Sequence, residues 1–145
     1  WCFSEPWKTA ANNSLISYPC EPKPGYYAVA DALRPILFSA RIPKFEWKTG
    51  EIFRAELWLL NDSISAVDEE VTAELELNGV IYPMFTWKAH AEAQRNTVGP
   101  SVNMKLPNVP SGQLKLRLRA GEFSSEYVLV YTAKEPAQPS RFMNM

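Results

Sequence analysis

Residues that build metal sites, disulfide frameworks and nucleophilic active sites are scarce in this sequence. It contains two cysteines, Cys2 and Cys20, and one histidine, His90. Two cysteines allow one disulfide or a pair of free thiols, and both alternatives stay open. Neither a zinc-type spacing nor a Cys-x-x-Cys pair occurs. We therefore expect no metal and no cofactor, and any histidine-dependent nucleophile would have to use His90.

Strong net charge and long apolar runs are also missing. The formal net charge is −1 at pH 7, with a sequence pI of about 5.9. This balance gives no electrostatic footprint for nucleic acid or for an anionic membrane. No apolar run approaches the length needed to span a bilayer. The 145 residues, of which 46% are hydrophobic, suit a single globular domain with its own core.

The chain is instead rich in segments where apolar and polar residues alternate. In residues 52–60, Phe53, Ala55, Leu57 and Leu59 fall on one side and polar residues fall mostly on the other. A period of two predicts a strand with one buried face. The same pattern predicts further strands at residues 36–42, 71–77, 80–87, 102–106, 113–120 and 126–132.

These segments are short and are separated by turn residues. Asn78-Gly79 is a strong hairpin signal, because both positions of a tight turn require positive φ. About seven such strands predict an all-β protein, an immunoglobulin-like β-sandwich with antiparallel strands. Residues 43–50 are expected to form a turn, and residues 135–145 a flexible tail.

Two other segments need separate treatment. Residues 87–98 favour a helix by propensity but alternate like a strand, and we favour the extended alternative. Residues 19–25 contain three prolines, which no regular element tolerates. Residues 26–33 then show helical spacing, and Pro35 ends that predicted helix.

The predicted strands carry little chemistry. His90 lies among alanines without an acid in a motif, so we expect an exposed histidine. Alternate positions place Glu74 and Glu76 on one solvent face, where nothing would raise a carboxyl pKa. A basic stripe on another strand could pair with them across the sheet or dock a neighbouring domain; it consists of Lys115, Arg117 and Arg119.

Trp58 is the exception on the polar side of residues 52–60. It lies beside Arg54 and Glu56. An aromatic side chain in that position indicates a partner surface or a shallow carbohydrate platform. The alternative is that a loop or the N-terminal segment covers it.

The N-terminal third contains a specific order of motifs. Residues 1–7 read WCFSEPW, residues 13–18 NSLISY, residues 22–29 PKPGYYAV and residues 33–36 LRPI. This order resembles the end of the catalytic barrel of glycoside hydrolase family 2, of β-mannosidase or β-galactosidase type. There a last strand of roughly Trp-x-x-Asn-Asp/Glu-x-Trp-Pro precedes a Pro-Lys-Pro-x-Tyr-Tyr-Ala helix start. Residues 47–62 also look like the beginning of that family's sandwich domain.

The match has departures. Ser4-Glu5 stands where the mannosidase-like pattern has an Asn-Asp pair, and Lys8 replaces a proline. These differences leave the accepted sugar open. The resemblance implies three parts: residues 1–35 as a strand, loop and helix remnant of a (β/α)₈ barrel, residues 36–134 as the sandwich, and residues 135–145 as the tail. Since the sequence starts inside a barrel strand, we expect a fragment of a longer protein.

The resemblance also implies a function. Family members are retaining glycosidases with two catalytic glutamates, and both would lie upstream of residue 1. This chain would then hold no catalytic residue and would itself be inactive. Trp1 matches the family tryptophan that lines the sugar pocket. Glu5 and Trp7 are further candidates for contacts to a β-linked glycoside in the intact enzyme only.

We thus expect a non-catalytic accessory domain whose partner is the catalytic barrel of the parent chain, with Trp58 at the interface. Family analogy favours a periplasmic or extracellular location. Without a barrel, residues 1–25 should pack poorly, lie over the sandwich or dock on another copy. The alternative function is a free-standing carbohydrate-binding or cell-surface adhesion module, which would need an exposed row of Trp47, Trp58 and Trp87.

Overall fold

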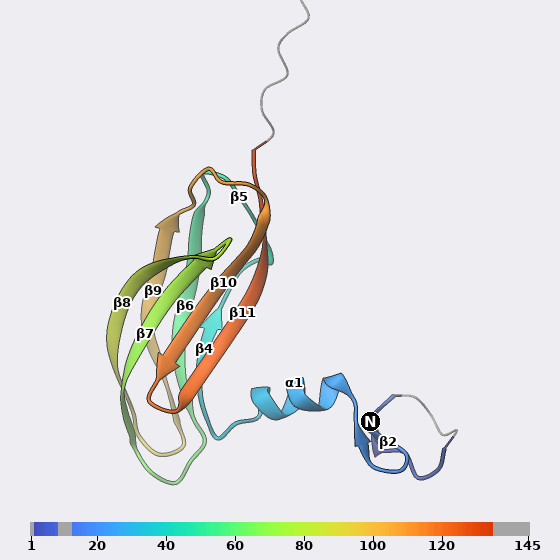
Figure 1. Cartoon of the computed structure of the whole chain (residues 1–145). Coiled ribbons are helices and arrows are strands. Elements are labelled where there is room, and N and C mark those ends of the chain that lie inside the picture. The colour runs from blue at the N-terminus through green and yellow to red at the C-terminus, as the bar shows by residue number, and fades with distance from the viewer. Residues whose placement is uncertain (1, 9–12, 135–145) are drawn as a thin grey trace, which may run out of the picture.

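The computed structural model describes residues 2–8 and 13–134, and most of them form two β-sheets packed face to face (Figure 1). The five-stranded sheet has the order β5-β11-β10-β7-β8, and the three-stranded sheet the order β4-β6-β9. The all-β sandwich predicted from the alternation is confirmed. Its strands are β4 (Ile36–Arg41), β5 (Glu46–Lys48), β6 (Ile52–Asn61), β7 (Val67–Leu77), β8 (Val80–Ala91), β9 (Arg95–Lys105), β10 (Gly112–Ala120) and β11 (Phe123–Thr132).

Residues 43–50 are not only a turn, because they contain the short strand β5. It pairs with β11 in parallel, whereas the other strand pairs of the two sheets are antiparallel. Described residues 36–134 therefore form eight strands rather than about seven. Three residues are too few for an alternation to be visible. The strand is held by its pairing with β11 and by Trp47, which is only 3% exposed.

Residues 87–98 are extended, as we favoured. β8 continues to Ala91, a turn covers residues 92–94, and β9 begins at Arg95. Gln94 adopts a positive φ of 56° in this turn. The extended form outweighs the helix propensity of this stretch because Ala89 and Ala91 are buried and pair with β7. An isolated preference of a few tenths of a kcal/mol per residue, roughly, cannot outweigh that burial and pairing.

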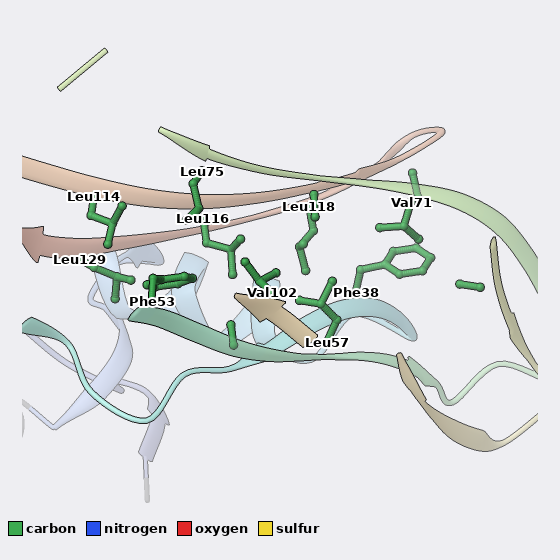
Figure 2. Packing of buried hydrophobic residues seen from close by; sticks show 14 of the residues in the cluster. Phe38, Phe53, Leu57, Val71, Leu75, Val102, Leu114, Leu116, Leu118 and Leu129 are labelled. Carbon is green, nitrogen blue, oxygen red and sulfur yellow. The ribbon is translucent and has the colours of Figure 1, made fainter. Parts of the chain in front are cut away.

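The core lies between the two sheets (Figure 2). Phe53 and Leu57 of β6 point into it from one side, and Leu75 and Leu116 point into it from the other. Each of these side chains occupies alternate positions of its strand, so the period of two in the sequence corresponds to the inward face. Burial of this apolar surface, at about 25 cal/mol per Å², provides most of the driving force for folding.

The outer face of the five-stranded sheet carries a charge network. The guanidinium of Arg117 pairs with Glu76 on β7 and, with 2.6 Å between Nε and Oε2, with Glu126 on β11. Lys115 Nζ lies 3.9 Å from Glu126 Oε1. The hydrogen bond from Arg117 is the main cause that lowers the pKa of Glu126. The simpler expectation for the basic stripe, cross-strand pairing, is confirmed for Glu76, whereas Glu74 Oε2 is buried without a hydrogen-bond partner among the described residues.

The N-terminal segment forms a small sheet and one helix. β1 (Cys2–Ser4), β2 (Ser14–Ser17) and β3 (Glu21–Pro22) pair in that order, with β1 and β2 parallel. α1 (Pro24–Ala32) starts at a proline, whose missing N–H has no partner to lose at a helix start. The helix predicted at residues 26–33 is confirmed, and it begins two residues earlier. Figure 1 shows this segment standing to one side of the sandwich.

Two expectations concern residues that the structure does not describe, and another concerns the two cysteines of the N-terminal segment. Trp1 and residues 135–145 are not described, so the predicted pocket tryptophan and tail stay predictions. Cys2 and Cys20 are both free thiols, so the disulfide alternative is not realised. Among residues 2–8 and 13–134, no helix has the length and apolarity to cross a bilayer.

Candidate interaction surfaces

Trp58 lies at the centre of the outer face of the three-stranded sheet. It pairs with Ser39 of β4 on one side and with Val98 of β9 on the other. Its indole Nε1 donates a hydrogen bond of 2.8 Å to Oε1 of Glu56, two residues earlier on the same face. The side chain is half-buried, so the indole is oriented by its own strand and still reaches the surface.

Apolar side chains gather around Trp58 at the end of the sheet nearest α1. Leu37 of β4 lies opposite Leu60 of β6, and both are half-buried on the outer face. Val98 beside them is exposed. The five-stranded sheet presents paired charges on its outer face, whereas this end presents a contiguous apolar strip. A strip of that kind is typical of a surface that contacts a partner.

The N-terminal segment, although short, exposes several large apolar side chains. Trp7 is 61% exposed and Leu33 is 75% exposed. Phe3 makes an edge contact with Tyr26, their ring centroids lying 6.4 Å apart, and Tyr26 makes another with Tyr27 at 5.5 Å. Single exposed apolar residues are ordinary, but an aromatic group beside further exposed apolar side chains indicates an interface.

Glu5 is engaged inside this segment. Its Oε1 accepts hydrogen bonds from Nζ of Lys23 at 2.6 Å and from Oγ of Ser14 at 2.9 Å. The hydrogen bond from Lys23, followed by that from Ser14, lowers the pKa of Glu5. With its side chain only 11% exposed, Glu5 ties β1 to β2 and to the start of α1. The substrate-contact role of Glu5 and of the exposed Trp7 stays a prediction.

Arg34 joins the N-terminal segment to the sandwich, a role that no sequence pattern indicated. Its Nη1 donates to the carbonyl of Ser124 at 2.8 Å, and its Nη2 to the hydroxyl of Ser125 at 3.3 Å. Its Nε donates to the carbonyl of Asp31 at the end of α1, at 2.9 Å. Arg34 thereby connects the helix end to the start of β11. An open cavity of about 570 Å³ lies beside this junction, between α1, β4 and β11.

The predicted row of exposed tryptophans is wrong. Trp47 faces inward and its ring centroid lies 4.8 Å from that of Phe53. Trp87 packs against the core and over Gly99, where an added Cβ would come within 2.5 Å of the ring. Because alternate positions of β5 and β8 point inward, Trp47 is buried and Trp87 is half-buried on the inner side of its sheet. Of the three, Trp58 alone lies on the outer face of the three-stranded sheet.

His90 has carboxylate neighbours on both sides of its ring. Nδ1 lies 2.8 Å from Oδ1 of Asp68, and Nε2 lies 3.2 Å from Oε1 of Glu92. The hydrogen bond to Asp68, followed by that to Glu92, raises the pKa of His90. With both nitrogens engaged by acids on an exposed strand face, the arrangement is an ion-pair cluster and not a base poised beside a nucleophile.

The His90 cluster gives a pH prediction. The imidazole of this single histidine is expected to titrate above its usual value, and Asp68→Asn should move the midpoint back towards that value. Because the folded pKa is raised, the pairs stabilise the fold below the unfolded pKa, and this contribution is lost as pH rises through the folded pKa. Proton NMR of the imidazole checks this directly. Glu70→Gln, at a neighbouring position of β7, is the control and should change the midpoint less.

Comparisons with known proteins establish the fold and nothing finer. No family model matches the chain, and no curated protein matches its sequence. Among solved structures, the sporulation control protein Spo0M from Bacillus subtilis is similar, with a TM-score of 0.53 and 9% identity over 70% of this chain and 51% of that one.

Two enzymes contain a similar sandwich. The alkylpurine DNA glycosylase AlkC from Pseudomonas fluorescens has a TM-score of 0.51 and 7% identity over 68% of this chain and 31% of its own. The β-glucosidase EmGH1 from Erythrobacter marinus has a TM-score of 0.51 and 9% identity over 67% of this chain and 16% of its own. The matched part of the chain thus corresponds to about a third of the length of AlkC and about a sixth of the length of EmGH1. A β-glycosidase is among the proteins in which this fold occurs.

Proposed function

We propose that this chain is a non-catalytic accessory domain of a retaining β-glycosidase of glycoside hydrolase family 2, of β-galactosidase or β-mannosidase type. One observation carries the proposal. The N-terminal segment, whose motifs resemble the end of such a barrel, leaves most of its aromatic side chains exposed, Phe3, Trp7, Tyr18 and Tyr27 among them. A catalytic barrel is the partner that would cover them.

The helix supports the need for such a partner. α1 has nine residues and none of them is buried. Isolated helices shorter than about 12–15 residues are marginal in water, because nucleation is costly and packing supplies most helical stability. Tyr27 and Val29 of α1 are exposed in this structure, as is Leu33 after it. A neighbouring domain that buried these side chains would provide the missing packing.

The sandwich would supply the second part of the interface. Trp58, Leu37 and Leu60 form the apolar strip on the outer face nearest α1. Arg34 would hold α1 against the sandwich, so that strip and helix face the partner in a defined arrangement. In the assembled enzyme, Trp1, Glu5 and Trp7 remain the candidates for contacts to the β-linked glycoside. The catalytic carboxylates would belong to the barrel.

Activity assays test the proposal. The purified chain is expected to release no nitrophenol above the buffer rate from nitrophenyl β-galactoside, β-mannoside or β-glucoside, because the resemblance places both glutamates elsewhere. Turnover that follows the pure protein through successive columns would overturn the assignment. A heat-denatured sample of the same preparation serves as the blank.

Binding of neutral sugars separates the accessory domain from the alternative adhesion or carbohydrate-binding module. An interface domain should show no saturable change in tryptophan fluorescence on titration with neutral β-linked oligosaccharides. With Trp47 in the core and the half-buried Trp87 packed against it, the alternative lacks the exposed aromatic row that it needed. A saturable change abolished by Trp58→Ala would favour that module.

A further inference from the structure

The outer face of the three-stranded sheet has a second region, at the end away from α1. A shallow depression of about 360 Å³ lies across β4, β6 and β9 (strands located in Figure 1). Its lining combines two arginines, a carboxylate, an amide, a hydroxyl and two apolar side chains: Arg41, Arg54, Glu56, Asn103, Ser101, Ile42 and Pro43. This volume is at the lower end of the range of small-ligand sites, about 300–1,000 Å³.

Two arginines in this depression form no ion pair with any residue that the structure describes. Arg41 lies opposite Glu56 in the strand register, and Arg54 is two residues before Glu56 on the same face. The two arginines are therefore diagonal neighbours, with about 7–8 Å between their Cα atoms. Both are exposed, and neither forms an ion pair or hydrogen bond through its side chain within residues 2–8 and 13–134.

Glu56 accepts the indole N–H of Trp58 through Oε1, forms no ion pair with either arginine, and carries one negative charge against their two positive charges. The contrast with the other sheet is direct, since Arg117 there contacts two carboxylates. Counting two arginines and one glutamate, the depression has one positive charge in excess. A guanidinium matches a carboxylate in a planar, bidentate arrangement, so this excess favours a carboxylate ligand.

We propose that this depression binds one acidic sugar unit, a uronic acid, through its carboxylate on Arg41 and Arg54. Ser101 and Asn103 lie on the adjoining strand β9 and offer a hydroxyl and an amide to the sugar hydroxyls. Ile42 and Pro43 provide apolar contact for the ring. The site does not depend on the docking of a barrel, so it can be tested on the chain alone.

The test is a titration of the ¹⁵N-labelled chain with methyl glucuronide, followed by amide chemical shifts. Saturable shifts are expected around Arg41, Arg54 and Asn103, weakening as salt is added. Methyl glucoside, which lacks the charge, should cause no saturable shift. The double variant Arg41→Ala/Arg54→Ala should bind at least about tenfold more weakly, the loss expected when two charge-assisted contacts are removed.

Arg95→Ala/Arg119→Ala is the matched control, because it removes the same charge at exposed positions outside the depression and should leave the titration unchanged. Retained chemical-shift dispersion in both double variants verifies that they fold. The proposal would be overturned by no saturable shift, by equal binding of the double variant at Arg41 and Arg54, or by an equal response to methyl glucoside. Acetate acting as well as the glucuronide would also overturn it, since a bare carboxylate from a docked protein would then suffice.

Discussion

Replacing Phe53 with alanine is expected to lower the free energy of unfolding by about 3–5 kcal/mol, the cost of removing a fully buried aromatic side chain. Phe53 is inaccessible to solvent in β6, the central strand of its sheet, and its ring contacts Trp47. Pairing with β4 and β9 on both sides limits how far β6 can move to fill the cavity. Urea titration followed by far-UV circular dichroism measures the loss.

The matched control is Ile64→Ala, because this side chain is 90% exposed and its removal should change stability by less than about 0.5 kcal/mol. Emission from Trp47 should also shift to longer wavelength in the Phe53 variant, since the indole loses the ring beside it. Equal unfolding midpoints for the two variants would show that the core is not organised around this contact.

Asn61→Ala is expected to cost about 2–4 kcal/mol, an effect of lost hydrogen bonds and not of volume. The side chain of Asn61 is fully buried at the end of β6. Its Nδ2 donates to the carbonyls of Ser65 at 2.8 Å, Glu92 at 3.0 Å and Ala91 at 3.3 Å. Its Oδ1 accepts from the amide of Ser63 at 3.0 Å. One side chain thus forms hydrogen bonds with backbone groups of the loop after β6 and of the turn between β8 and β9.

Asn61→Asp distinguishes hydrogen bonding from shape. The carboxylate has the same outline but no N–H donor, so the three carbonyl groups would face a negative charge. The aspartate variant should therefore be at least as unstable as the alanine variant at neutral pH. Asn108→Ala, at an exposed position with one long contact, should be near neutral and serves as the control. An aspartate variant as stable as the unchanged chain would contradict this account.

The strands and their inward faces were predictable because burial repeats with the pleat. Phe53 and Leu57 could be assigned to the core from their spacing alone, and both are fully buried. The extended form of residues 88–91 was predictable for the same reason, although propensity favoured a helix. These predictions succeeded because each depends on residues close together in the sequence.

The burial and contacts of Trp47, Asn61 and Arg34 were not predictable from the local sequence pattern. Trp47 belongs to a three-residue strand that exists because β11, more than 80 residues away, pairs with it. Asparagine is typical of turns, yet the turn between β8 and β9 covers Asn61. Its buried amide donates hydrogen bonds to the carbonyls of Ala91 and Glu92. Arg34 reaches partners about 90 residues later in the chain. In each case the partner comes from a distant segment.

The sequence by itself determined the strand positions, the inward faces and the exposed character of His90, because these depend on period, turn chemistry and composition. The motifs that resemble a glycosidase barrel were also visible in it. Only the tertiary structure decided that Trp58 forms an apolar strip with Leu37 and Leu60 and that Arg41 and Arg54 share one depression. Strand register and sheet order bring those side chains together, and both arise from pairing between distant segments that no local pattern encodes.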